Sequence, residues 1–178
     1  MFKNLYPYEY VESVFTIDYK KLYEKGYKGI IFDIDNTLVH HGDDSTKQID
    51  ELFKTIQKIG LKTLVLSNNN KERVTRFLKN IDSLYICDAE KPNTQNYFKA
   101  LEMLKIKKEE AVYVGDQIFT DILGANKSQI PSILVKFIKA PGETKIGKKR
   151  QIEKIILKLY KKSKKYQHRL GNITKTEE

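Results

Sequence analysis

Two aspartates, Asp33 and Asp35, stand one residue apart at the end of an apolar run, and the hydroxyl of Thr37 follows them. An apolar run that ends in polar residues is typical of a buried strand that leads into a loop. If the strand lies in a parallel sheet, its carboxyl end is where ligands bind. Two neighbouring carboxylates repel each other, and a divalent cation relieves that repulsion while one carboxylate serves as a nucleophile. The pattern therefore indicates a chemical site.

Three more polar signals follow three further apolar runs that we interpret as strands. Ser67, Asn68 and Asn69 follow the second run, and Lys91 follows the third. Asp116 follows the fourth, with Asp121 about one helical turn later. Each signal alone is weak, because a Ser-Asn loop is usually a helix cap and a Lys-Pro pair is usually a turn. Together they supply what phosphoryl transfer needs, namely a nucleophile, an acid/base, an anion-binding loop, a fixed cation and metal ligands.

The elements that would position these groups alternate between strand and helix. We expect strands at residues 29–33, 62–66, 84–87, 111–114 and 133–135. We expect helices at residues 18–24, 46–59, 70–78, 92–104 and 120–128, from apolar side chains at helical spacing and from capping residues. Strands that alternate with helices predict a doubly wound α/β fold, a parallel sheet with helices on both faces.

Length and composition fit one folded domain. The chain has 178 residues, of which 40% are hydrophobic and 31% charged, a composition that favours a globular over a disordered protein. A single cysteine cannot form an intramolecular disulfide. The N-terminus lacks the apolar core of a signal peptide, and no apolar run reaches the roughly 20 residues that span a bilayer. We expect a cytoplasmic protein with a domain at residues 1–141 and a basic helix and tail at residues 142–178.

The four motifs together resemble the haloacid dehalogenase superfamily of aspartyl phosphatases. The chain shows Asp-x-Asp-x-Thr from Asp33, a Ser at position 67, Lys-Pro from Lys91, and Gly-Asp-x-x-x-x-Asp ending at Asp121. The residues within these motifs, and the segment around Pro7 that precedes the first predicted strand, are similar to those of the YqeG branch of subfamily IIIA. That branch includes phosphatidylglycerophosphate phosphatases that act at membranes. The resemblance covers roughly residues 26–135.

The resemblance implies a role for each matching residue. Asp33 would attack phosphorus and form an aspartyl phosphate, and Asp35 would act as the general acid and then the general base. Thr37 would hold the loop geometry around Asp35. The Ser67 hydroxyl and the Asn68 amide would bind phosphate oxygens, and Lys91 would neutralise the charge of the nucleophile and the transferring group. The following groups would surround Mg²⁺ or its waters: Asp33, the Asp35 carbonyl, Asp116 and Asp121, with Gln117 beside them.

Several of these residues have plainer interpretations. Asp121 could be an acid in the first turn of its helix, where the helix dipole stabilises it. Ser67 could do no more than cap the following helix, and we expect Asn70 to have only that role. We interpret His40 and His41 as surface loop residues, because no third ligand stands at metal-binding spacing.

The spacing of the motifs bears on the substrate. Superfamily members usually select substrates with a cap domain, and neither the gap from Thr37 to Ser67 nor that from Ser67 to Lys91 has room for one. An open site fits a phosphomonoester on a large or surface-borne substrate. In the tail, Ile152, Ile155 and other apolar residues recur at helical spacing among many basic residues. Such a helix either binds an anionic membrane surface or packs its apolar stripe on the domain.

These observations lead to a Mg²⁺-dependent phosphomonoesterase with a capless fold. On the resemblance, the preferred substrate is phosphatidylglycerophosphate, a phospholipid headgroup reached from the inner face of the membrane. The second possibility is a phosphatase for a protein or a nucleic-acid 3′ end. The third is a basic RNA- or ribosome-associated binding protein with a vestigial site. The acids, Ser67 and Lys91 are all intact, which argues against the third possibility, because a vestigial site would be expected to have lost at least one of them. The chain also lacks the stacking-aromatic motif of an RNA-binding module, which argues against nucleic acid as a partner.

Overall fold

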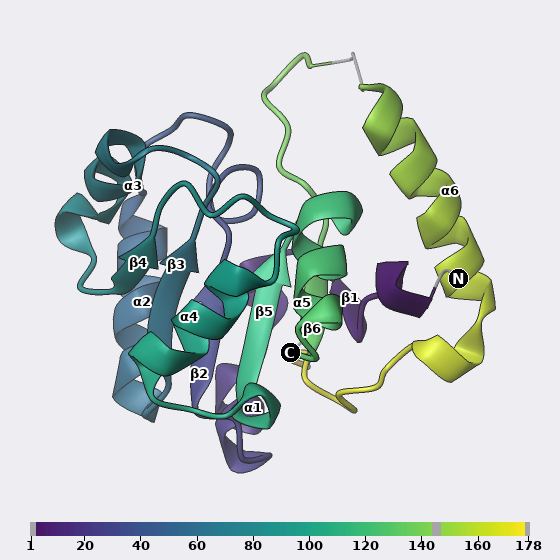
Figure 1. The fold of residues 1–178 in the computed structure, drawn as a ribbon, viewed down its shortest axis with the longest axis horizontal. Coiled ribbons are helices and arrows are strands. Elements are labelled where there is room, and N and C mark those ends of the chain that lie inside the picture. Colours follow the sequence, from purple (N-terminus) through teal and green to yellow (C-terminus); the bar gives the residue numbers. More distant parts are fainter. Residues whose placement is uncertain (1–2, 144–146, 177–178) are drawn as a thin grey trace.

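The computed structural model describes residues 3–143 and 147–176 (Figure 1). Within these residues six strands form one sheet, and every neighbouring pair is parallel. The strand order is β1 (Glu9–Val11), β6 (Ser132–Val135), β5 (Ala111–Gly115), β2 (Gly29–Phe32), β3 (Lys62–Leu66) and β4 (Leu84–Ile86). The five predicted strands are confirmed as β2 to β6. The additional strand β1 pairs with β6 at one edge of the sheet; its three residues are too few to show an alternating pattern.

Helices cover both faces of the sheet, as the doubly wound fold requires. The first face carries α1 (Tyr19–Glu24), α2 (Lys47–Ile59) and α3 (Lys71–Phe77), and the second carries α4 (Gln95–Leu104) and α5 (Leu123–Lys127). Neighbouring residues of β2 separate the two cores: Ile30 packs in the same cluster as Phe53 of α2, whereas Ile31 packs with Tyr97 of α4. This follows from the strand geometry, in which successive side chains point to opposite faces.

The ends of the helices follow the predicted capping residues in part. The Thr46 hydroxyl caps α2 and Gly60 ends it with a φ of 110°, while the Asn70 side chain caps α3 as expected. Helix α4 begins at Gln95 rather than at residue 92, because the Asn93 side chain accepts the Gln95 amide and closes a turn first. The helix predicted at residues 120–128 begins as a π-helical turn, Ile118–Ile122, and continues as α5.

The segments between the motifs hold only elements of the domain itself. One loop and α2 lie between Thr37 and Ser67, and α3 and β4 lie between Ser67 and Lys91. The fold is therefore capless, and the carboxyl ends of the central strands are not covered by an inserted domain.

The last part of the chain forms α6 (Lys148–Lys162), which lies beside β1 and β6 (Figure 1). Ile156 on this helix packs with Ile118, Ile122 and Leu134. Beyond it, Ile173 enters the main core and its carbonyl accepts the Asp18 amide at 2.7 Å. The division at residue 141 stays a prediction. Of the helices in the described ranges, none has the length and apolar character needed to cross a membrane.

Candidate active site

The predicted site residues converge at the carboxyl ends of four strands. Asp33 follows β2, Ser67 follows β3 and Asp116 follows β5, while Lys91 reaches the same place across the loop after β4. A small pocket of about 180 Å³ lies there, and Asp33 and Lys91 line it. Its walls include Asp33, Asp35, Asn68, Lys91, Gln117 and Asp121.

Lys91 is the centre of the charge network. Its ammonium Nζ lies 2.7 Å from Asp33 Oδ1 and 2.7 Å from Asp121 Oδ1, and it donates to the Tyr113 hydroxyl at 3.1 Å. The Lys91 side chain is only 3% exposed. Burial would lower the pKa of Lys91, but the charges of Asp121 and Asp33 outweigh burial and raise it. Lys91 is therefore a fixed cation at neutral pH.

Asp33 is buried and has an unusual acidity. Burial raises the pKa of Asp33 to about 6, although the charge of Lys91 acts in the opposite direction. Thr37 Oγ1 lies 3.1 Å from Asp33 Oδ2 and 3.0 Å from Asp116 Oδ1, so one hydroxyl joins two carboxylates. We expected Thr37 to hold the loop around Asp35; in the structure its side chain contacts Asp33 and Asp116 instead. The reason is that Thr37 points into the sheet end, where both acids lie.

Three buried carboxylates could hold a cation. Asp33, Asp116 and Asp121 each offer an oxygen within 4.8 Å of the others. Each carboxylate oxygen of Asp33 and Asp116 accepts one side-chain hydrogen bond. Each oxygen of Asp121 accepts two, from Lys91 and Tyr113 at Oδ1 and from two backbone amides at Oδ2. Carboxylate oxygens are the ligands that Mg²⁺ prefers, so the donor set fits this ion. The contacts favour Asp33 and Asp116 as ligands and Asp121 as the partner that orients Lys91.

Asp35 also lines the pocket and has its own set of partners. Its carboxylate accepts the Gly42 amide at 2.9 Å and Arg73 Nη2 at 2.9 Å, and it also accepts a hydrogen bond from Asn69. Burial acts to raise the pKa of Asp35, but the hydrogen bonds from Gly42, Arg73 and Asn69 lower it below its ordinary value. Asp35 is therefore held as a carboxylate.

The Ser67–Asn69 loop uses its side chains internally in this structure. The Ser67 hydroxyl accepts the Asn69 amide at 3.1 Å and Asn69 Nδ2 at 3.0 Å. The Asn68 side chain accepts the Lys91 amide at 2.8 Å and so fixes the backbone that carries the Lys91 ammonium. The binding of phosphate by Ser67 and Asn68 stays a prediction.

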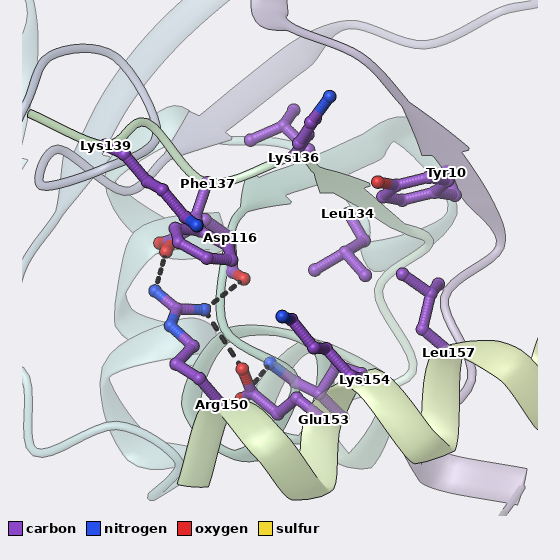
Figure 2. Close-up of a pocket in the computed structure, with 12 residues that line it drawn as sticks. Tyr10, Asp116, Leu134, Lys136, Phe137, Lys139, Arg150, Glu153, Lys154 and Leu157 are labelled. Atoms are coloured by element: carbon purple, nitrogen blue, oxygen red, sulfur yellow. Dashed lines mark hydrogen bonds and ion pairs between the residues drawn. The ribbon is translucent and has the colours of Figure 1, made fainter. Parts of the chain in front are cut away.

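Asp116 is held from outside the sheet by α6. Arg150 Nη1 donates to the Asp116 carbonyl at 2.7 Å and to Glu153 Oε2 at 3.0 Å, and Nη2 binds the Asp116 carboxylate (Figure 2). Glu153 Oε1 in turn accepts the amides of Ile118 at 2.8 Å and Phe119 at 3.2 Å. Burial and the nearby acids Asp121 and Asp33 raise the pKa of Asp116, and Arg150 opposes this. The basic helix thus contacts the site directly.

The sequence did not indicate four of these partners: Arg73, Tyr113, Arg150 and Glu153. Asn69 was part of the Ser-Asn signal, but its contact with Asp35 was not predicted. Weak signals existed for some of them. Tyr113 is the one phenol in an otherwise aliphatic strand, and Arg150 and Glu153 stand three residues apart, so they share a helix face within a run of lysines. Neither signal names the partner: Tyr113 contacts Lys91, 22 residues earlier in the chain, and Arg150 contacts Asp116, 34 residues earlier.

The two neighbouring histidines lie at the edge of the site. His41 is exposed and its Nδ1 is 3.8 Å from Asp35 Oδ1, so it forms part of the pocket rim. His40 Nε2 lies 3.6 Å from Glu143. Both belong to the loop after β2, which agrees with their interpretation as loop residues.

Comparisons with known proteins point to one family. The pattern of the haloacid dehalogenase-like hydrolases matches residues 43–129. The chain is 35% identical to "Probable phosphatase YqeG" of Bacillus subtilis (strain 168) over 161 residues, which cover 90% of this chain and 94% of the relative. In fold it is similar to an uncharacterized protein from Listeria monocytogenes serotype 4b, with a TM-score of 0.53, 21% identity, and coverage of 76% and 99% of the two chains.

The YqeG relative matches along nearly its whole length, and the buried acids and lysine stand where the motifs predicted them. The chain therefore belongs to the haloacid dehalogenase-like hydrolases and is a phosphatase of that family.

Proposed function

We propose that this protein is a Mg²⁺-dependent phosphomonoesterase that acts through an aspartyl phosphate on Asp33, and that its substrate is phosphatidylglycerophosphate. The observation that carries the mechanism is the position of Lys91, 2.7 Å from Asp33 and 2.7 Å from Asp121 in a buried pocket. A buried cation beside a carboxylate stabilises negative charge that develops on a transferring group.

In the first half-reaction, a carboxylate oxygen of Asp33 attacks phosphorus. The bond from phosphorus to the leaving alkoxide breaks, and a proton from Asp35 converts that alkoxide to an alcohol. In the second half, Asp35 accepts a proton from water, and the water oxygen displaces the Asp33 carboxylate from phosphorus. The products are an alcohol and inorganic phosphate.

A Mg²⁺ ion held by Asp33 and Asp116 would supply positive charge against the phosphoryl oxygens. Thr37, which contacts both acids, would keep these two carboxylates turned toward each other. Lys91, positioned by Asp121 and Tyr113, would compensate the remaining negative charge on the nucleophile.

Asp35 is prepared for the second half-reaction. Its lowered pKa and its contact with Arg73 favour the carboxylate, which is the form that accepts a proton from water. To act as the acid in the first half, Asp35 must lose part of this stabilisation. We infer that the entering substrate displaces Arg73 from Asp35.

A membrane-borne substrate fits the outer surface of α6. Ile152, Ile155 and Leu159 share one face of this helix and are 50%, 59% and 45% exposed, while Ile156 and Tyr160 face the domain. The helix thus packs on the domain with one side and presents an apolar stripe on another. A helix with an apolar stripe among many basic residues fits an anionic lipid surface. We propose peripheral binding to such a surface.

The test is phosphate release from phosphatidylglycerophosphate in anionic vesicles, with Mg²⁺ and with a chelator, for the wild type and Asp33→Asn. We expect release that requires Mg²⁺ and is lost in the variant. Turnover of an aryl phosphate without release from the lipid would keep the mechanism and exclude the lipid substrate. No turnover of either compound would contradict the proposed function.

A further inference from the structure

A second cavity lies between α6 and the chain that follows β6. It encloses about 530 Å³, a size within the range of about 300–1,000 Å³ typical of small-molecule sites. Figure 2 shows Leu134 in its interior, with Tyr10 and Leu157 on one side and Arg150, Asp116 and Lys139 on the other. This cavity, which we name the β6–α6 cavity, has an apolar floor formed by Ile118, Leu134, Val135, Phe137 and Leu157.

The charges around this floor are mostly positive. Lys136, Lys139, Lys154 and Arg150 line the cavity, against two acids, Asp116 and Glu153. Both acids are bound by Arg150, and Glu153 also accepts two backbone amides. The three lysines are exposed at the rim; Lys136 pairs with Glu12 at 3.2 Å, which leaves Lys139 and Lys154 as the rim lysines without an ion pair in the described part of the chain.

The β6–α6 cavity adjoins the catalytic pocket. Asp116 lines the cavity, and the next residue, Gln117, lines the pocket that contains Asp33. One turn of chain after β5 is therefore the wall between them. A ligand bound in the cavity would contact the same turn that lines the catalytic pocket.

The chemistry of the lining selects the occupant. An apolar floor favours hydrocarbon and disfavours the hydroxyl groups of a free sugar phosphate, because buried polar groups without partners are costly. The lysine rim favours a negative charge close to that hydrocarbon. The occupant should therefore have a hydrocarbon part, a negative group beside it and a second phosphate that reaches the catalytic pocket. A phospholipid that carries two phosphates has these three features.

We propose that the β6–α6 cavity is the lipid subsite of this enzyme. It binds the acyl-glycerol part of the phospholipid, and the rim lysines bind the internal phosphodiester, while the terminal phosphate lies at Asp33. The proposal rests on the proposed function for the role of the lipid as substrate. The binding itself is testable without catalysis.

The experiment measures calorimetric binding of monomeric dihexanoyl-phosphatidylglycerol, which has the phosphodiester and acyl chains but no phosphomonoester. We expect Lys154→Glu to weaken binding about ten-fold through charge repulsion, and Leu157→Trp to weaken it at least as much by filling the cavity. Lys158→Glu is the matched control, because it makes the same charge change on an exposed residue of α6 that does not line the cavity. We expect it to stay within two-fold of the wild type.

A second ligand separates the two parts of the subsite. Deacylated glycerophosphoglycerol should bind at least ten-fold more weakly than the dihexanoyl lipid. Equal affinities for these two ligands, or equal effects of Lys154→Glu and Lys158→Glu, would overturn the proposal. Cavity-dependent binding without phosphate release from phosphatidylglycerophosphate would support the subsite and contradict the substrate. Phosphate release from that lipid, together with lipid binding that Lys154→Glu does not weaken, would support the substrate and contradict the subsite.

Discussion

The catalytic pocket and the β6–α6 cavity share one turn but are built differently. In the pocket of about 180 Å³, charged groups are paired at close range, as Lys91 is with Asp33 and Asp121. In the cavity of about 530 Å³, three lysines stand at the rim of an apolar floor. On the proposals above, the pocket would fix a small, highly charged group in one geometry, whereas the cavity would accept a larger apolar group in several. Chemistry and substrate recognition are therefore proposed to lie on opposite sides of the Asp116–Gln117 turn.

The largest effect is expected when the ammonium of Lys91, which pairs with the acids of the catalytic pocket, is removed. Lys91→Met should lower kcat by about 10²- to 10³-fold, since it removes a preorganised charge from the transferring group. It also leaves Asp33 and Asp121 without their buried partner, which should cost about 3–5 kcal/mol of stability. Phosphate release and urea denaturation measure the two effects.

The control for this change is Lys99→Met, an exposed lysine on α4. It should alter neither quantity measurably. A Lys91→Met protein that keeps wild-type turnover would show that the pocket is not the catalytic centre.

A smaller effect is expected where α6 meets the shared turn. Arg150→Gln removes the contacts to the Asp116 carbonyl and carboxylate, so Asp116 loses its fixed orientation. Loss of such an outer partner typically costs about 10- to 100-fold in metal affinity, and we expect the low end, about ten-fold weaker Mg²⁺ binding. Calorimetric titration of Mg²⁺ measures it, with exposed Lys149→Gln as the control. Tighter Mg²⁺ binding in Arg150→Gln would show instead that Arg150 competes with the metal.

The buried charge of Asp33 should make the stability of the metal-free protein depend on pH. The pKa of Asp33 is raised to about 6 in the folded protein from 3.8, so its contribution to stability is fully present below pH 3.8 and is lost as the pH rises through about 6. A shift of about two units corresponds to roughly 3 kcal/mol. In chelator, Asp33→Asn should therefore gain stability over the wild type between pH 4 and pH 8. Parallel stability profiles for the two proteins would contradict this.

The smallest effect is expected on the outer side of α6, away from both sites. Ile155 is 59% exposed, so Ile155→Ser should change stability by less than about 0.5 kcal/mol. Cosedimentation with anionic vesicles should nevertheless fall, because the apolar stripe is interrupted. Ile156→Ser is the contrasting variant: it alters the buried side of the helix and should destabilise the protein. Unchanged vesicle binding in Ile155→Ser would remove the stripe from the proposed membrane contact.

Local patterns predicted the elements that carry the motifs, because strands such as β2 and β5 are apolar and end at polar residues. They also predicted that Asp33, Lys91 and Asp116 would meet, since parallel strands present their carboxyl ends together. The strand β1 was not predicted, because its pairing with β6 depends on a partner more than 100 residues away. The contacts of Thr37 and Arg150 likewise depend on side-chain directions and on the docking of α6, which periodicity does not determine.

The docking of the C-terminal segment also has a consequence for synthesis. Ile173 packs in the core beside residues near the start of the chain, and Arg150 completes the turn at Asp116. On the ribosome, the sheet and its first motifs emerge well before these residues do. A nascent chain can therefore form most of the sheet while its Asp116 turn still lacks its outer support, so this turn is among the last parts of the enzyme to reach its final geometry.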